Sequence, residues 1–221
     1  MPKHLRREIE NLKKKILDLG AGIETVVHEA IRSIEERDAV LAQKIIDDDI
    51  EIDHTEVEIE EDCLKILALY QPVAIDLRFI VAILKINSDL ERIGDLAVNI
   101  AERSVFLASV PQVNASLDFA RMSKKTESMV NKCLDALVNM SSELANEVCA
   151  DDDEVDAINR QMYLRIQEAI QEYPDQVPSL IHLLSVSRHL ERIADHATNI
   201  AEDVVYMVEG RIVRHKAEEY K

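Results

Sequence analysis

The chain has 221 residues, of which 47% are hydrophobic, with four glycines and five prolines, a composition typical of an all-helical protein with its own core. Its net charge of −17 and pI of about 4.8 argue against nucleic-acid binding, which depends on clustered lysine and arginine. No apolar run is long enough to span a bilayer, and the N-terminus lacks the apolar segment of a signal peptide. With three cysteines and no CxxC motif, these features predict a cytoplasmic protein with reduced thiols. Attachment to a membrane through a partner stays open.

The first half of the chain predicts three helices. Apolar residues at steps of four and three run from Leu5 to Ala30, which is the spacing of a helix in a bundle. Gly20 and Gly22 lie inside this helix and predict a bend or a close helix contact rather than its end. A second helix is expected at 39–70, capped by Asp38 and ended by the Gln71-Pro72 pair. A third carries core residues at bundle spacing from position 83 to 100.

The second half predicts the same arrangement after a break at Pro111. A fourth helix spans about 119–140, and a fifth, capped by Asp151 or Asp152, ends at the Tyr173-Pro174 pair. A sixth begins near Pro178. The sequence therefore predicts an all-α fold of two tandem three-helix bundles, residues 1–110 and 111–221, related by internal duplication.

A second copy of one segment supports the duplication. The stretch LERIGDLAVNIAE at 90–102 returns as LERIADHATNIAE at 190–202. The residues that both copies share include polar ones, and packing alone would preserve only the apolar spacing. The shared polar residues are Glu91/Glu191, Arg92/Arg192, Asp95/Asp195, Asn99/Asn199 and Glu102/Glu202.

These acids predict a cation site in each half. On a helical wheel Glu91, Asp95 and Asn99 fall within an arc of about 80°, nearly opposite the core-facing side. The second helix offers Asp49 and Asp53, and the fifth offers Asp152 and Asp156 as their equivalents, which would face Glu191, Asp195 and Asn199. Neighbouring antiparallel helices would then bring two carboxylate pairs together, an oxygen-rich set that suits hard or borderline cations. The first half, with more carboxylates, is expected to bind more tightly.

The acidic residues are also compatible with other interpretations. Residues 47–62 contain ten acidic side chains, and such a run is usually a solvated surface. A ferritin-like di-iron or iron-storage bundle would need two E-x-x-H motifs facing a four-helix core, and only Glu51 and His54 match. His54 and His196, each next to an aspartate, are expected to lie at the surface or to interact with the helix dipole rather than to act as metal ligands. No phosphate-binding loop, nucleophile elbow or catalytic triad is visible, so no catalytic residues are predicted.

Three segments resemble the PhoU family: PVAIDLR at 72–78, DLERIGD at 89–95 and NIAE at 99–102. The segments HLERIADH at 189–196 and NIAE at 199–202 are similar to the second repeat of that family. The resemblance covers essentially the whole chain and implies two three-helix bundles whose E(D)-x-x-x-D motifs hold surface clusters of iron or other metals, among which zinc, manganese and magnesium are candidates. Asn159 and Tyr163 depart from the acidic pattern, which puts full occupancy of the second site in doubt.

The resemblance also implies a regulatory role. PhoU-like proteins restrain the phosphate-starvation (Pho) response when phosphate is plentiful. They are thought to link the ATPase of the phosphate ABC transporter to a PhoR-type sensor kinase, and they are often homodimers. The expected function is therefore that of an adaptor that negatively regulates the phosphate-starvation response and modulates high-affinity phosphate uptake, without an active site.

Overall fold

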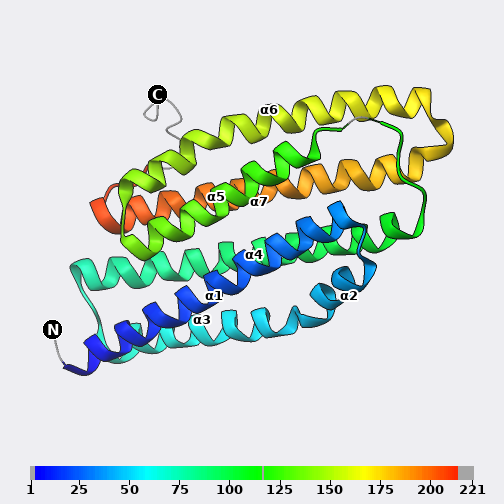
Figure 1. Cartoon of the computed structure of the whole chain (residues 1–221). Coiled ribbons are helices and arrows are strands. Elements are labelled where there is room, and N and C mark those ends of the chain that lie inside the picture. Colours follow the sequence, from blue (N-terminus) through cyan, green and yellow to red (C-terminus); the bar gives the residue numbers. More distant parts are fainter. Residues whose placement is uncertain (1–2, 116, 214–221) are drawn as a thin grey trace.

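The computed structural model describes residues 3–115 and 117–213, and all regular structure in that part of the chain is helical. The first half contains α1 (Lys3–Glu36), α2 (Ala39–Asp48), α3 (Ile50–Tyr70) and α4 (Ala74–Ser109). The second contains α5 (Phe119–Asn139), α6 (Ser142–Glu172), a short 3₁₀ turn η1 (Pro174–Gln176) and α7 (Val177–Glu209). Figure 1 shows two elongated three-helix bundles lying side by side, with α2 and α3 together forming one broken helix of the first. The predicted fold class is confirmed.

Local signals place most helix ends where the sequence predicts them. Asp38 caps α2 by accepting hydrogen bonds from the backbone N–H groups of Val40 and Leu41 at 2.9 and 3.0 Å. Gln71 ends α3 in the left-handed region, directly before the first proline break. Gly20 marks a close helix contact, because a Cβ built there would lie 2.8 Å from Leu134 Cδ2 of α5.

Two predicted boundaries are wrong. The second helix is not continuous, because it breaks at Asp49, the last of three consecutive aspartates, a residue type with low helix propensity. The fifth helix begins at Ser142 rather than near Asp151 or Asp152. Met140 takes a left-handed conformation that ends α5, and Ser141 Oγ then accepts the backbone N–H of Leu144. The two aspartates lie inside α6.

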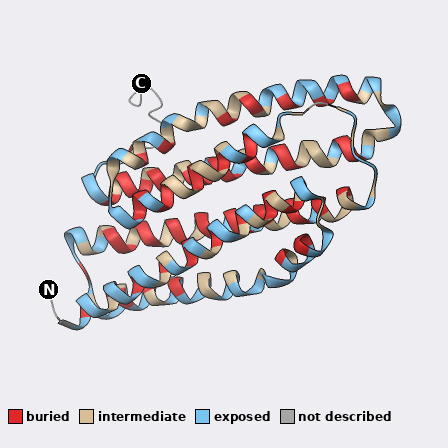
Figure 2. Ribbon diagram, in the orientation of Figure 1, coloured by how far each residue is buried: buried red, intermediate tan, exposed pale blue. Residues whose placement is uncertain are grey.

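The two halves share one hydrophobic core. Most buried apolar residues of α1 to α7 belong to one continuous cluster, whose fully buried members include Ile86 and Leu90 of α4 with Ile193 and Val204 of α7. A smaller cluster of α6 and α7 residues, Ile166, Ala169 and Leu180, is separate from it. Figure 2 shows this buried side of α4 and α7 between the bundles. The division into domains 1–110 and 111–221 stays a prediction. No helix in the described residues combines the length and apolar character that crossing a bilayer requires.

Polar contacts join the halves across α4 and α7. His196 Nδ1 lies 2.8 Å from Asp89 Oδ1, and both residues are buried. Asn199 Nδ2 donates to the same oxygen at 3.4 Å, and Lys85 Nζ lies 3.2 Å from Asp203 Oδ1. These pairs match early residues of α4 with late residues of α7, so the two helices are antiparallel. The surface position expected for His196 is wrong, because the copy of the segment in the second half faces the first half.

The buried histidine pair gives a stability prediction. A carboxylate oxygen accepts hydrogen bonds, so the imidazole N–H of His196 donates to Asp89 Oδ1. His196→Leu introduces the residue type found at position 96 of the first copy. It removes a hydrogen-bond partner from a buried carboxylate, so we expect the free energy of unfolding to fall by about 2 kcal/mol. Urea titrations measure this change. Asp89→Leu combined with His196→Leu should recover most of that loss. An unchanged single variant would show that the pair contributes nothing.

Candidate functional site

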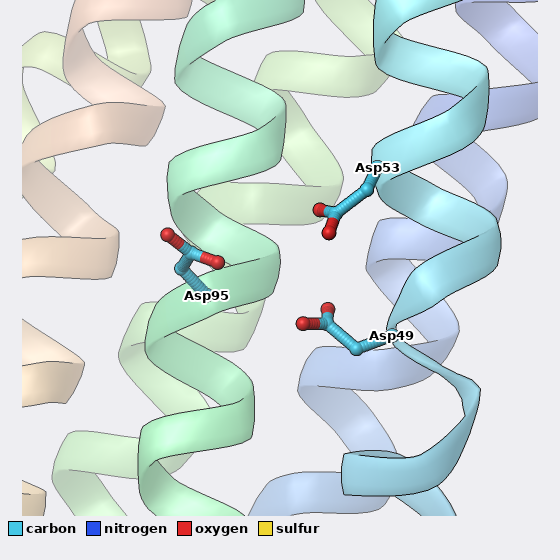
Figure 3. Close-up of side chains that lie close together, drawn as sticks. All are labelled: Asp49, Asp53 and Asp95. Atoms are coloured by element: carbon cyan, nitrogen blue, oxygen red, sulfur yellow. The ribbon is translucent and has the colours of Figure 1, made fainter.

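Three acidic side chains from two helices meet on one side of the first bundle. Asp49 and Asp53 lie at the start of α3, and Asp95 lies on the adjacent α4. One carboxylate oxygen from each lies within 4.8 Å of the others. Figure 3 shows the carboxylates of Asp49 and Asp53 directed toward α4, on which the Asp95 side chain lies facing the viewer. In the described residues this is the one such group of three or more carboxylate, imidazole or thiolate ligands. The pairing of these two helix segments that the sequence predicts is therefore present.

Two local features bring the helices into this arrangement. The break between α2 and α3 falls at Asp49, which places its side chain at the first turn of α3. Gly94, directly before Asp95, lets α4 approach its neighbours, since a Cβ there would lie 3.1 Å from Ile23 Cδ1 and 3.5 Å from Ile52 Cγ2. Neither feature is visible in the shared E-x-x-x-D pattern.

The three carboxylates of Asp49, Asp53 and Asp95, the first acidic site, place negative charges close together without a basic side chain among them. Burial raises the pKa of Asp49, and the charges of Asp53 and Asp95 raise it further. Burial and the charge of Asp53 raise the pKa of Asp95. Asp49 Oδ1 is buried without a hydrogen-bond partner. A bound cation would relieve this repulsion and satisfy that oxygen, so the donor set fits a hard or borderline metal ion.

Glu91 and Glu56 extend the acidic site along the two helices. Burial, followed by the charges of Asp95 and Glu56, raises the pKa of Glu91. Asn87 Nδ2 donates to the backbone carbonyl of Glu56 at 2.9 Å and to its Oε1 at 3.2 Å, which holds that acid beside α4. Asn87 is not among the predicted site residues, although a polar residue among the buried positions 83, 86 and 90 was a signal. Asn99 donates its amide to the backbone carbonyl of Asp95 at 2.7 Å.

The second half repeats the acids without the same convergence. Asp152 and Asp156 of α6 face Glu191 and Asp195 of α7, but among the described residues no three of them approach within 4.8 Å. Burial, then the charges of Asp195 and Asp156, raises the pKa of Asp152 to about 6. The charge of Glu191 contributes to the raised pKa of Asp195, after burial. The four carboxylates therefore interact as a group.

The departures of the second half from the acidic pattern have structural counterparts. Asn159 stands where the first half has Glu56, and its Oδ1 accepts a hydrogen bond from Ser187 Oγ at 2.7 Å. The Glu56–Asn87 pair is thus replaced by an uncharged pair in the equivalent place. Tyr163 is exposed. Asn199, expected as a ligand, directs its amide to Asp89 across the interface between the halves.

Asp152 gives a prediction about pH. Its pKa is higher in the folded chain than its ordinary value of 3.8, so the folded state binds more protons and stability falls as pH rises from about 4 to 6. In metal-free protein at pH 7 the free energy of unfolding of Asp152→Asn should therefore exceed that of the parent by about 1 kcal/mol after allowance for solvent screening. At pH 4 the two proteins should be equally stable. Urea unfolding in chelator at both pH values measures this. The control is Asp153→Asn, which changes the exposed neighbour. An equal gain in stability at pH 7 in this variant would refute the raised pKa of Asp152 as the cause.

The iron-storage alternative finds no support in the geometry. Glu51 and His54, the single E-x-x-H match, are both exposed on α3. They do not face the interior of a bundle, where a di-iron site of that class would lie.

Comparison with protein families gives a match in each half. The chain matches the PhoU domain at residues 16–104 and again at 119–204. A relative from Aquifex aeolicus (strain VF5), named a phosphate-specific transport system accessory protein PhoU homolog, is 38% identical over 212 residues, which are 96% of each chain. A relative of the same name from Pseudomonas aeruginosa is 34% identical over 94% of this chain and 86% of its own length.

Solved structures show the same architecture. The crystal structure of PhoU from Pseudomonas aeruginosa superposes with a TM-score of 0.91 at 33% identity, over 93% of this chain and 99% of that one. The phosphate transport system regulatory protein PhoU from Streptococcus pneumoniae superposes with a TM-score of 0.83 at 29% identity, over 95% and 99%. The likeness therefore extends over the full length of these proteins.

Proposed function

The chain belongs to the PhoU family, and we propose that it restrains the phosphate-starvation response by acting as an adaptor between the phosphate ABC transporter and its sensor kinase. An accessory and regulatory role in phosphate transport is the function that its relatives carry in their names. The observation that carries the proposal is agreement with them in both sequence and fold over nearly the whole chain.

The proposed partners are the ATPase of the transporter and a PhoR-type kinase on the cytoplasmic side of the membrane. The net charge of −17 supports contacts with basic protein surfaces, because complementary charge raises association rates and disfavours wrong partners. A homodimer is part of the same proposal and would present each acidic surface twice.

We further propose that metal ions bind the acidic sites. In the first half Asp49, Asp53 and Asp95 would hold the ion, with Glu91 and Asn99 beside them. In the second half the set is Asp152, Asp156, Glu191, Asp195 and Asn199. The buried, unpaired oxygen of Asp49 supports the first of these. Iron, zinc, manganese and magnesium are the candidate ions, since carboxylate oxygens accept all four.

Loss of the protein is the test of the regulatory proposal. Cells that lack the chain are expected to produce alkaline phosphatase in phosphate-rich medium at a level close to that of starved wild-type cells, because restraint of the kinase would be lost. Phosphatase activity of the deletion strain, with and without a plasmid copy, measures this. Phosphatase that stays repressed in the deletion strain would refute the regulatory role.

A further inference from the structure

The outer side of α3 carries a line of exposed apolar side chains. Ile50, Val57 and Leu64 are 61%, 49% and 53% exposed and follow each other at seven-residue intervals. At that spacing each residue is displaced by only about 20° from the last, so the three form one stripe along the helix. α3 lies at the outer edge of the first bundle, and Figures 1 and 2 show its solvent-facing side uncovered by other helices of the chain.

The duplicated half shows that the fold does not need this stripe. When α3 is aligned with α6, the Asp49/Asp53 pair matches Asp152/Asp156. The same alignment matches buried residues of α3 with buried residues of α6, Ile59 with Met162 and Cys63 with Ile166. In that register the three stripe positions are polar in α6: Asp153, Arg160 and Gln167. Two exposed apolar residues of α6, Tyr163 and Leu164, fall instead where α3 has two glutamates. A second bundle of the same design thus folds with polar residues at these positions.

Acidic side chains border the stripe on both sides. On the helical wheel Asp53 and Glu60 flank one side of the stripe. Glu61 flanks the other side, where His54 and Lys65 come next and Glu58 and Glu51 lie further round the helix. The helix contains seven acidic residues and a single lysine, Lys65. Lys15 of α1 offsets part of this charge, since its ammonium lies 3.1 Å from Glu58 and 2.8 Å from Asp62. A second copy of α3 on this surface would oppose acid with acid, so charge disfavours self-association here.

From these features we propose that the outer face of α3 is the docking surface for a basic amphipathic helix of a partner protein. The apolar residues of that helix would cover Ile50, Val57 and Leu64, and its lysine and arginine side chains would meet the acids on either side. The proposal rests on the proposed adaptor role, in which the protein works through contacts with other proteins. A stripe of three side chains suits a transient complex rather than a permanent one.

Photo-crosslinking in cells tests the surface and its occupant together. Benzoylphenylalanine replaces Val57 or Leu64 in the full chain, and the equivalent α6 positions, Arg160 and Gln167, serve as matched controls. The expected result is a crosslink from the α3 positions to a protein segment with net positive charge and apolar residues at helical spacing, identified by mass spectrometry. Crosslinks to a second copy of this chain, to lipid or to an acidic segment would overturn the proposal, and so would α3 yields no higher than those of the α6 controls.

A peptide titration separates the stripe from general charge attraction. The probe is a synthetic fluorescent peptide of 21 residues, with leucine on one helical face and lysine and arginine on the others. Val57→Gln with Leu64→Gln is expected to weaken its binding at least tenfold in fluorescence anisotropy, with unchanged helicity. Tyr163→Gln with Leu164→Gln removes two exposed apolar residues from α6 and should leave binding unchanged. Unchanged binding in both variants would attribute it to net charge, and equal losses in both would attribute it to exposed apolar residues in general. Either result would refute the stripe.

The phosphatase measurement distinguishes failure of this inference from failure of the proposed function. With both correct, the Val57→Gln/Leu64→Gln variant fails to repress phosphatase in a deletion strain, whereas the α6 variant represses it. A deletion that derepresses, complemented fully by the α3 variant, would overturn the docking surface alone. A deletion without effect would overturn the regulatory function, and the crosslinks and peptide titration would still decide the surface.

Discussion

Protein purified without chelator and without a metal-affinity column is expected to contain iron, zinc, manganese or magnesium, and Asp49→Asn/Asp53→Asn/Asp95→Asn is expected to lose the ion of the first half. These three carboxylates converge within 4.8 Å, and burial leaves one oxygen of Asp49 without a partner. Changes to groups that only support metal ligands cost about 10- to 100-fold in affinity. Removal of three direct ligand charges should therefore weaken binding by at least about 100-fold.

Elemental analysis by plasma mass spectrometry after dialysis measures the loss. The matched control is Asp18→Asn/Glu24→Gln/Glu35→Gln, which removes the same charge from exposed positions of α1. The variant of the site should also be more stable than the parent in chelator, because burial, and then repulsion among the acids, raises the pKa of Asp49 and Asp95 in the folded chain. Equal metal content in the parent and in both variants would show that Asp49, Asp53 and Asp95 do not bind the metal ion.

Neither half of the chain is expected to fold alone. Fragments 1–110 and 111–221 would each expose the side of α4 or α7 that the other half covers in the shared core. Each apolar side chain uncovered costs about 1.5–3 kcal/mol, so four of them approach the whole stability of a typical domain, about 5–15 kcal/mol. We expect the separate fragments to show no cooperative thermal transition and the equimolar mixture to recover one.

A full chain with a protease site inserted in the 111–118 connection is the control for the fragments. After cleavage its halves should stay associated and should melt close to the temperature of the intact chain, because the core between α4 and α7 is unchanged. Fragments that melt separately at the temperature of the whole chain would instead show two independent domains. Circular dichroism and size-exclusion chromatography give both results.

The sequence by itself determined the helices and the acidic pairs. Apolar spacing, the cap at Asp38 and the proline breaks act within a few residues of the chain, so they can be recognised without knowledge of the fold. The spacing of Asp49 from Asp53, and of Glu91 from Asp95, likewise places each pair on one side of its own helix. The pairing of these helices followed from the short connection between them.

Only the tertiary structure decided how the two halves meet. His196 and Asn199 lie in the second copy of the repeated segment, yet they contact Asp89 of the first half, because the burial of α4 against α7 depends on residues a hundred positions away. The same is true of the difference between the acidic sites. The break at Asp49 and the close approach at Gly94 bring three acids together, whereas α6 runs unbroken through its equivalent acids. Such contacts depend on the mutual position of whole helices, which no local sequence signal specifies.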